Sequence, residues 1–245
     1  MKGILFVSLL FSSVACAAEP SRFMSGPTQV TLIELYTSEG CSSCPPADHW
    51  LGALKDDAGL WKQFVPVEFH VNYWDSLGWK DRLSSPGFTA REYAYSAAWG
   101  SQNVYTPCFV RNGAEWKPSW GGAGGPQGGP AGQLEVTVAG DGACSVKYSP
   151  VAASAPSAYK LHVALLGGGL SSHPNAGENE GETLKHEFVV LGLAEASLSP
   201  VGGGLGAQVA LPLPSVPDAK RRAVAAWVTR EGDQAPVQAT GGWLP

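Results

Sequence analysis

The chain contains the stretch VTLIELYTSEGCSSCPP at residues 30–46. Its first seven residues are mostly apolar or β-branched, which predicts a buried strand. Pro45 and Pro46 fit the first turn of a helix, where the missing backbone N–H groups would have had no intrahelical partner. The stretch therefore predicts a strand that passes through a turn into a helix, with Cys41 and Cys44 at the start of that helix.

Two cysteines separated by two residues at a helix start are suited to dithiol–disulfide exchange. The unpaired N–H groups and the dipole of the helix stabilise a thiolate there. We expect Cys41, nearest the exposed turn, to be the nucleophile and Cys44 to be the resolving cysteine. The alternative is a structural disulfide, although a bond that closes so short a loop restricts the unfolded chain little. A zinc site would require further ligands at a suitable spacing, and the other cysteines are scattered at Cys16, Cys108 and Cys144.

Residues 1–18 predict a secretory signal peptide. Lys2 supplies the positive start, an apolar run follows, and the small residues at 15–17 are typical of a cleavage site near residues 17–18. The alternative is that Cys16 carries a lipid anchor. Later segments lack the ~18 uninterrupted apolar residues of a membrane helix. We therefore predict a periplasmic or secreted protein that is not integral to a membrane.

Composition narrows the possible partners and the cysteine pairing. The formal net charge is -5 at pH 7, and the absence of a dense Lys/Arg cluster argues against nucleic acid as a partner. After cleavage, Cys41, Cys44, Cys108 and Cys144 remain in an oxidising compartment, which permits two disulfides. We expect Cys108–Cys144 to be a structural disulfide. The alternative is that Cys108 exchanges with the Cys41–Cys44 pair.

The rest of the chain divides at a Gly/Pro-rich stretch, residues 119–133, which predicts a linker or long loop. Before it, strands are expected at 64–71 and 108–110 and a helix at 86–99, which is the element order of an α/β layer fold. After it, short apolar segments separated by Gly, Pro, Asn and Ser predict a β-sandwich-like domain at residues 134–245.

Several motifs together resemble those of a known family. They are TSEGCSSCPPAD at 37–48, HVNYWD at 70–75, YTP at 105–107, GEN at 177–179 and FVV at 188–190. The sequence resembles the DUF1223 family, secreted bacterial thioredoxin-like proteins of unknown function. The resemblance implies an α/β thioredoxin-like domain, a mixed sheet with flanking helices, at residues 27–118 and a β-rich region after it.

Two further residues are candidates for the site. The resemblance implies that Pro107 follows a cis peptide bond, lies opposite the cysteine pair and presents its backbone to an extended substrate. Glu34, on the strand before the cysteines, is a candidate proton relay to Cys44. The alternative for Glu34 is an ordinary strand residue whose carboxylate has local partners.

The sequence thus predicts an exported thiol–disulfide oxidoreductase that acts on the thiols or disulfides of partner proteins. One alternative is a non-catalytic binding or scaffold protein, and another is a protein that binds or delivers Cu(I) through Cys41 and Cys44. No cofactor is expected, because the chain has no phosphate-binding glycine loop and no nucleophile elbow. No other metal site is expected either, because His173, Glu178 and His186 match no compact ligand spacing. They are predicted to belong to a hairpin.

Overall fold

The structure is a computed structural model that describes residues 19–119, 122–123, 128–151, 158–211 and 218–245. The predicted signal peptide, Cys16 and part of the Gly/Pro-rich stretch lie outside these residues. Within the described part of the chain, no helix is long and apolar enough to cross a membrane.

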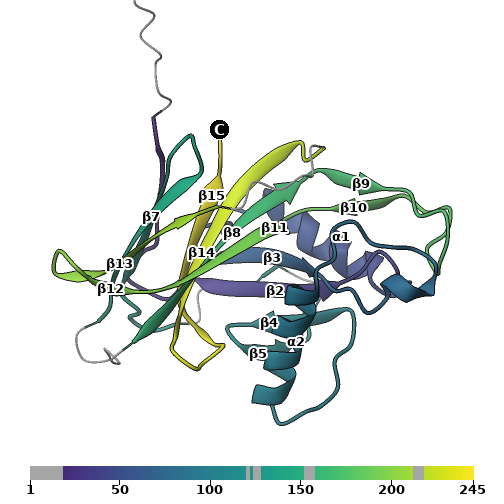
Figure 1. The fold of residues 1–245 in the computed structure, drawn as a ribbon, viewed down its shortest axis with the longest axis horizontal. Helices are drawn as coiled ribbons and strands as arrows, with labels where there is room; N and C mark the ends of the chain where they lie inside the picture. Colours follow the sequence, from purple (N-terminus) through teal and green to yellow (C-terminus); the bar gives the residue numbers. More distant parts are fainter. Residues whose placement is uncertain (1–18, 120–121, 124–127, 152–157, 212–217) are drawn as a thin grey trace, which may run out of the picture.

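Strands dominate the described residues (Figure 1). In chain order the elements are β1 (Ser21–Met24), β2 (Thr31–Thr37), α1 (Pro45–Ala53), the 3₁₀ turn η1 (Leu54–Asp56), β3 (Phe64–His70), the 3₁₀ turn η2 (Asp75–Leu77), α2 (Pro86–Ala98), β4 (Cys108–Arg111), β5 (Ala114–Trp116), β6 (Gln133–Val138), β7 (Ala143–Ser149), β8 (Tyr159–Gly168), β9 (Leu170–Ser172), β10 (Leu184–His186), β11 (Val189–Ser197), β12 (Ser199–Val201), β13 (Gly204–Ala210), β14 (Arg221–Arg230) and β15 (Pro236–Trp243).

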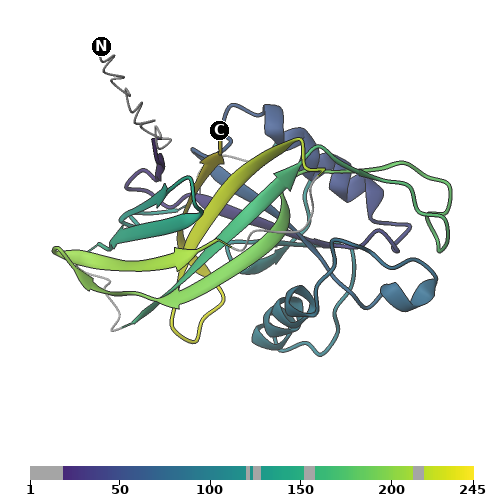
Figure 2. The ribbon, with the colours of Figure 1, turned by 45° about the horizontal axis from the view of Figure 1, so that its top comes forward.

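Eight of these strands form one mixed sheet in the order β15-β14-β8-β11-β3-β2-β4-β5. β3 is parallel to both of its neighbours, β2 and β11, and the remaining pairs are antiparallel. A second, antiparallel sheet has the order β1-β6-β7-β13-β12, and β9 pairs with β10 in a separate hairpin. Figure 2 shows the five-stranded sheet at the opposite end of the molecule from that hairpin.

The predicted fold class is wrong. The structure is 45% strand and 13% helix with only two α-helices among the described residues, which is not a helix-flanked thioredoxin-like domain followed by a separate sandwich. The decisive feature is the contact between β3 and β11. Glu68 of β3 pairs with Val189 of β11, and the Glu68 N–H donates to the carbonyl oxygen of Phe188. Four C-terminal strands therefore extend the sheet past β3.

The domain limits at residues 118 and 134 stay a prediction. The eight-stranded sheet takes four strands from the range 27–118 and four from the range 134–245. Backbone hydrogen bonds of one sheet therefore connect the two ranges.

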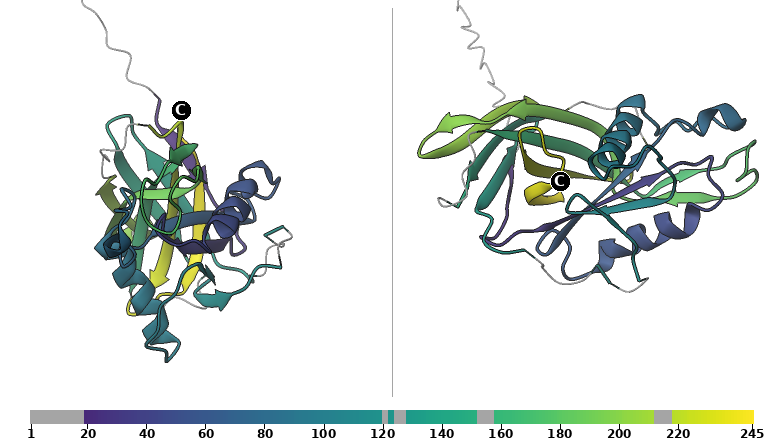
Figure 3. Two further views of the ribbon diagram at one scale, coloured as in Figure 1. Left: turned by 90° about the vertical axis from the view of Figure 1, so that its right-hand side faces the viewer. Right: turned by 90° about the horizontal axis from the view of Figure 1, so that it is seen from below.

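Local sequence signals predicted the starts of both α-helices correctly. α1 begins at Pro45, directly after Cys44 as its N-cap. α2 begins at Pro86, and the hydroxyl of its N-cap Ser85 accepts a hydrogen bond from a backbone N–H in the first turn. α1 and α2 lie on opposite faces of the part of the sheet that contains β2 and β3 (Figure 3). The helix starts were predictable because their causes lie within a few residues of chain.

Two apolar cores flank the central strands. Side chains of β8 and β14 alternate between them: Leu166 and Trp227 belong to the core that includes both helices, whereas Leu165 and Val228 belong to the core beneath the five-stranded sheet. Because β8 and β14 are buried on both faces over most of their length, they contain the continuous apolar runs 163–166 and 223–228.

The expected Cys108–Cys144 disulfide is not formed. Both cysteines are free and buried, Cys108 on β4 of the eight-stranded sheet and Cys144 on β7 of the five-stranded sheet. They belong to different apolar cores, so the two side chains pack in separate parts of the protein. Burial raises the pKa of the Cys108 thiol to about 12 and that of Cys144 to about 11. Neither thiol is activated for exchange.

Candidate functional site

Cys41 and Cys44 form a disulfide in the turn that starts α1. The Cys41 N–H donates to the carbonyl oxygen of Ser38 at 3.1 Å, and the Cys44 N–H donates to that of Cys41 at 3.2 Å. The Cys44 carbonyl oxygen then accepts from the N–H groups of Ala47 and Asp48 at 2.8 and 3.1 Å. The turn is therefore held by backbone hydrogen bonds as well as by the disulfide.

The disulfide is sealed from solvent. Cys41 and Cys44 each expose 0% of their surface, whereas Ser42 and Ser43 between them are exposed. We expected Cys41 to lie near the exposed part of the turn. The exposed residues are its neighbours Ser42 and Ser43, and Cys41 itself is buried. Its sulfur has the hydroxyl of Ser43 as a neighbour at 3.4 Å.

The loop between β9 and β10 contacts the disulfide turn. The side-chain amide of Asn179 donates to the carbonyl oxygens of Glu39 and Cys41 at 2.8 and 3.0 Å. A carboxylate oxygen of Glu178 accepts from the N–H of Ser42 at 3.1 Å and from its hydroxyl at 2.7 Å. Figure 1 shows this hairpin extending alongside the start of α1. The hairpin predicted from the second half of the chain is therefore a cover for the cysteine pair.

The other side of the turn contacts Trp74. A Cβ added at Gly40 would lie 2.9 Å from the Cβ of Trp74, so glycine is needed there for close approach. The indole N–H of Trp74 donates to the hydroxyl of Thr106 at 2.8 Å. The Thr106–Pro107 peptide bond is cis, which confirms that prediction. Trp74 thus contacts both the cysteine turn and the Thr106–Pro107 segment, while the role of Pro107 in holding a substrate stays a prediction.

Glu92 of α2 fixes the segment that precedes Pro107. Its carboxylate accepts from the N–H of Tyr105 at 3.2 Å and from the hydroxyl of Tyr73 at 3.3 Å. Burial raises the pKa of Glu92 to about 7, against which these two hydrogen bonds act. The carboxyl group therefore changes charge near neutral pH next to the candidate site.

Glu34 has partners that differ from those of a proton relay. Its carboxylate accepts from Arg91 Nε at 2.8 Å, from the Tyr36 hydroxyl at 3.1 Å and from the Tyr95 hydroxyl. Arg91 belongs to α2, and its guanidinium lies over the rings of Phe69, Tyr95 and Trp227.

The position of Glu34 on β2 explains this arrangement. Successive strand side chains point to opposite faces, and Thr37 of β2 contacts Asp48 of α1 on the other face. Glu34 therefore lies on the face away from the helix that carries Cys44. The contacts of Glu34 agree with the alternative, in which it is a strand residue whose carboxylate has local partners. Its placement gives no support to a role as proton relay.

A buried charged cluster lies next to the disulfide turn, and the sequence reasoning missed it. Its members come from five places in the fold, and each exposes at most 4% of its surface: Glu39, Asp48, Glu68, His70, Asp81 and His186. His70 lies between two acids, with Nδ1 2.6 Å from Asp81 and Nε2 2.8 Å from Glu68. His186 Nδ1 lies 2.9 Å from the same oxygen of Glu68.

Burial and neighbouring charges set the ionisation of the cluster. Burial raises the pKa of Asp48 to about 7, and the charge of Glu68 adds to that effect. Burial alone would lower the pKa of His70, but the Asp81 and Glu68 carboxylates hold it well above its usual value. The pKa of Glu68 is held below its usual value by hydrogen bonds from His186 and His70, which overcome the opposing effect of burial.

One sequence signal could have found part of the cluster. Glu68 and His70 alternate on β3, so that both point to one face of a strand that is buried throughout. A charged pair on such a face requires partners of opposite charge. His186 was weighed with His173 and Glu178, but His173 is exposed and Glu178 binds Ser42.

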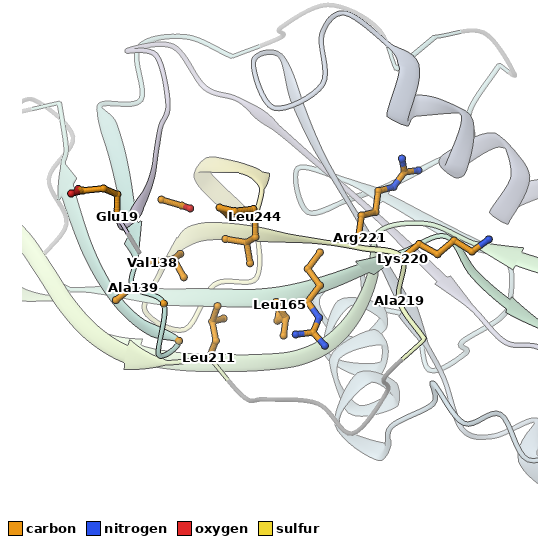
Figure 4. Close-up of a pocket in the computed structure, with 14 residues that line it drawn as sticks. Glu19, Val138, Ala139, Leu165, Leu211, Ala219, Lys220, Arg221 and Leu244 are labelled. Carbon is orange, nitrogen blue, oxygen red and sulfur yellow. The ribbon is translucent and has the colours of Figure 1, made fainter. Parts of the chain in front are cut away.

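A separate cleft lies between the two sheets and plays no part in this site. Figure 4 shows it lined by Leu165, Leu211 and Leu244, with Lys220 and Arg221 at one end. Its lining includes none of the residues around the disulfide.

Comparison with known proteins gives a family but no activity. The sequence matches the family described as "Protein of unknown function (DUF1223)" over residues 32–229. The chain belongs to this family. The match to the DUF1223 family extends from β2 into β14, so it includes the cysteine turn, the β9–β10 hairpin and the charged cluster. A comparison with curated proteins found no match.

Two solved structures are similar in fold. One is the crystal structure of protein AGR_C_4864 from Agrobacterium tumefaciens, with 24% identity and a TM-score of 0.60, covering 87% of this chain and 94% of that one. The other is HBP35 of Porphyromonas gingivalis, with 16% identity and a TM-score of 0.63, covering 90% of this chain and 76% of that one. At these identities the likeness concerns the fold alone.

The ion pair of Glu34 yields a stability prediction. Replacing Glu34 by Gln leaves the Arg91 charge buried without its counter-ion, which should lower the free energy of unfolding by about 3–5 kcal/mol. Urea unfolding measures it. Glu135→Gln is the matched control, because it removes the carboxylate from an exposed Arg–Glu pair, and it should change stability little. A small effect of Glu34→Gln, equal to that of the control, would contradict the buried ion pair.

The raised pKa of Glu92 yields a pH prediction. The folded state holds the proton of Glu92 to about pH 7, while the unfolded chain releases it near 4.5. The contribution of this group to stability is therefore complete below pH 4.5 and is lost as the pH rises through 7. Glu92→Gln keeps an acceptor for Tyr105 and does not titrate. Between pH 4 and pH 8, the free energy of unfolding of this variant should rise relative to that of the native protein by up to about 3 kcal/mol. Chemical unfolding at several pH values measures the difference. A stability difference that stays constant with pH would refute the assignment.

Proposed function

We propose that this protein is a thiol–disulfide oxidoreductase that exchanges disulfides with partner proteins through Cys41 and Cys44. The observation that carries the proposal is the disulfide within the first turn of α1. The two cysteines are three positions apart, so the bond restricts the unfolded chain very little. Because backbone hydrogen bonds already hold the turn, a structural role leaves the disulfide unexplained.

The position of the pair supports exchange chemistry. A cysteine at a helix N-terminus has a stabilised thiolate, which makes it both a good attacking group and a good leaving group. Cys108 and Cys144 are buried and have raised pKa values, so they are poor competitors. The exchange therefore involves Cys41 and Cys44 alone.

The reaction moves two electrons between the pair and a partner dithiol. A partner thiolate attacks the sulfur of Cys41, the Cys41–Cys44 bond breaks, and Cys44 leaves as a thiolate that takes up a proton. A second partner thiolate then attacks the partner sulfur of the mixed disulfide and releases Cys41. The partner is oxidised to a disulfide and the pair is reduced. In the opposite direction Cys41 attacks a partner disulfide and Cys44 resolves the intermediate.

Access to the disulfide requires movement of the β9–β10 loop. The contacts of Asn179 and Glu178 with the turn are hydrogen bonds at its edge, each with a net contribution of about 1 kcal/mol. Loops held by so few bonds open locally at low cost. The loop thus sets how often a partner reaches Cys41.

An exchange assay tests the proposed function. The oxidised protein is mixed with a reduced dithiol peptide, and the reduced protein with a protein disulfide such as that of insulin, while thiols are trapped by alkylation and counted by mass. Turnover is expected in at least one direction. Cys41→Ser should abolish it, Cys44→Ser should accumulate a mixed disulfide through Cys41, and Cys144→Ser should leave the rate unchanged.

Other outcomes of this assay identify the alternatives. No turnover, together with a reduction potential below about −300 mV, would show a static disulfide. Stoichiometric Cu(I) uptake by the reduced protein, lost in Cys41→Ser and without disulfide turnover, would show a copper-binding protein.

Loosening the cover should speed the reduction of the disulfide. Replacing Asn179 and Glu178 together by Ala removes the side-chain bonds to the turn, and we expect dithiothreitol to reduce the disulfide at least about ten times faster. Glu180→Ala, an exposed charge in the same loop, is the matched control and should react at the native rate. Near-ultraviolet circular dichroism checks that the fold is kept. An unchanged rate in the folded double variant would show that the loop does not limit access.

A further inference from the structure

We propose that Glu68, His70 and His186 form a binding site for a divalent transition-metal ion, with Zn²⁺ as the expected occupant. All three side chains are buried, and their ligand atoms lie within 4.8 Å of one another. Glu68 and His70 come from the end of β3, and His186 ends β10. The proposal is independent of thiol chemistry at the disulfide.

The hydrogen bonds of His70 define which nitrogen is available. Nδ1 lies 2.6 Å from Asp81, a carboxylate that also accepts from the N–H groups of Glu39 and Leu83. Nδ1 is therefore the N–H donor, which leaves Nε2 of a neutral imidazole with its lone pair towards Glu68 at 2.8 Å. Two acceptors repel at this distance, so a cation must lie between them. That cation is either a proton or a metal ion.

His186 faces the same carboxylate oxygen of Glu68. Its Nδ1 is 2.9 Å from Glu68 Oε1, the oxygen that also faces His70. Without a metal, this single oxygen accepts a hydrogen bond from each of the two rings, and the other carboxylate oxygen accepts none. The other oxygen, Glu68 Oε2, is buried without a hydrogen-bond partner, and so is His186 Nε2. Such orphaned buried groups are costly. A divalent ion bound by Glu68 replaces both protons and gives the carboxylate a partner.

The surroundings follow the pattern of metal-binding histidines. A ligating histidine usually donates its second ring N–H to a carboxylate, which fixes its orientation. His70 has Asp81 in that place at 2.6 Å. The Nε2 of His186 faces Glu39 at 3.6 Å, which is too long for a hydrogen bond. The pattern is therefore complete at His70, and at His186 a carboxylate lies on the same side as the nitrogen that would not bind the metal.

The charge of the cluster favours a divalent cation. Four carboxylates are buried together, and their ion pairs within the described chain are with His70 and His186 only. Two imidazoles and a carboxylate are a common protein ligand set for Zn²⁺. Asp48 is the candidate fourth ligand, because its Oδ2 is 3.9 Å from His186 Nδ1 and the Thr37 hydroxyl donates to its other oxygen at 2.6 Å.

Metal content and stability test the site. The protein is kept oxidised, so that Cys41 and Cys44 cannot bind metal. It is unfolded with a chelator, then refolded with one equivalent of Zn²⁺, of Co²⁺ or of no metal. We expect one ion per chain after gel filtration, a higher melting temperature with Zn²⁺, and a visible Co²⁺ spectrum without sulfur-to-metal charge transfer. That last feature excludes the two free thiols as ligands.

Variants locate the ion. Glu68→Gln and His186→Gln should each reduce the bound Zn²⁺ at least tenfold, whereas His49→Gln, an exposed histidine on α1, should retain it. X-ray absorption on the Zn²⁺-loaded native protein supplies the ligand set even where a variant fails to fold. A native protein that binds no metal and melts at the same temperature with or without Zn²⁺ would overturn the proposal, and would show that the histidines are protonated instead. Full retention of Zn²⁺ in both variants would overturn it as well.

Discussion

Glu68 connects the two halves of the molecule in two ways. Its backbone makes the pairing between β3 and β11, through Val189 and the carbonyl oxygen of Phe188. Its buried carboxylate lies between His70, two residues later on β3, and His186 at the end of β10. The main chain thereby joins the N-terminal and C-terminal strands into one sheet, and the side chain places a charge at that junction. The charge has to be balanced by partners from both halves.

The arrangement around the disulfide follows from this balance. His186 ends β10, so its contact with Glu68 holds one end of the β9–β10 hairpin against β3. The loop of the same hairpin places Asn179 on the carbonyl oxygens of Glu39 and Cys41. The hairpin is therefore fixed at a buried, charged end and by a few hydrogen bonds at its exposed loop. This difference makes the loop, rather than the strands, the part able to uncover Cys41.

The sequence predicted those features whose causes lie close together along the chain, and it missed those that depend on contacts between distant residues. The start of α1 after Cys44 and the start of α2 after Ser85 have causes within one turn of chain, and the sequence predicted both. The extension of the sheet depends on one residue pair between β3 and β11, which are more than a hundred residues apart. No local sequence pattern predicts this pairing. The central position of β8 and β14 could not be predicted either. Strands that pack against a core on each face lose the alternation of apolar and polar residues that shows which face is buried.

The candidate site shows the same limit. The cysteine pair and the cis bond before Pro107 were predicted from motifs. For Glu34 the sequence predicted the strand but not the face. The contact of Thr37 with Asp48 assigns the opposite face of β2 to α1, so the placement of Glu34 gives the relay no support. The charged cluster was missed because residues 64–71 were predicted only as a strand, while the histidine that completes the cluster follows 118 positions after Glu68.

The cluster also bears on the chemistry of the disulfide. Reduction places a thiolate at the start of α1, where the helix N-terminus favours negative charge. Asp48, in the same first turns of α1, and Glu39, two residues before Cys41, are buried carboxylates that oppose it. The two effects have opposite sign, and His70 and His186 are the ion-pair partners of the buried carboxylates. If the pair exchanges disulfides as proposed, a cation that stays between Glu68, His70 and His186 in both redox states would offset the carboxylates, and the helix end would keep its preference for a Cys41 thiolate. The charges of this cluster thus form part of the electrostatic environment of the cysteine turn, whether a proton or a metal ion lies between its side chains.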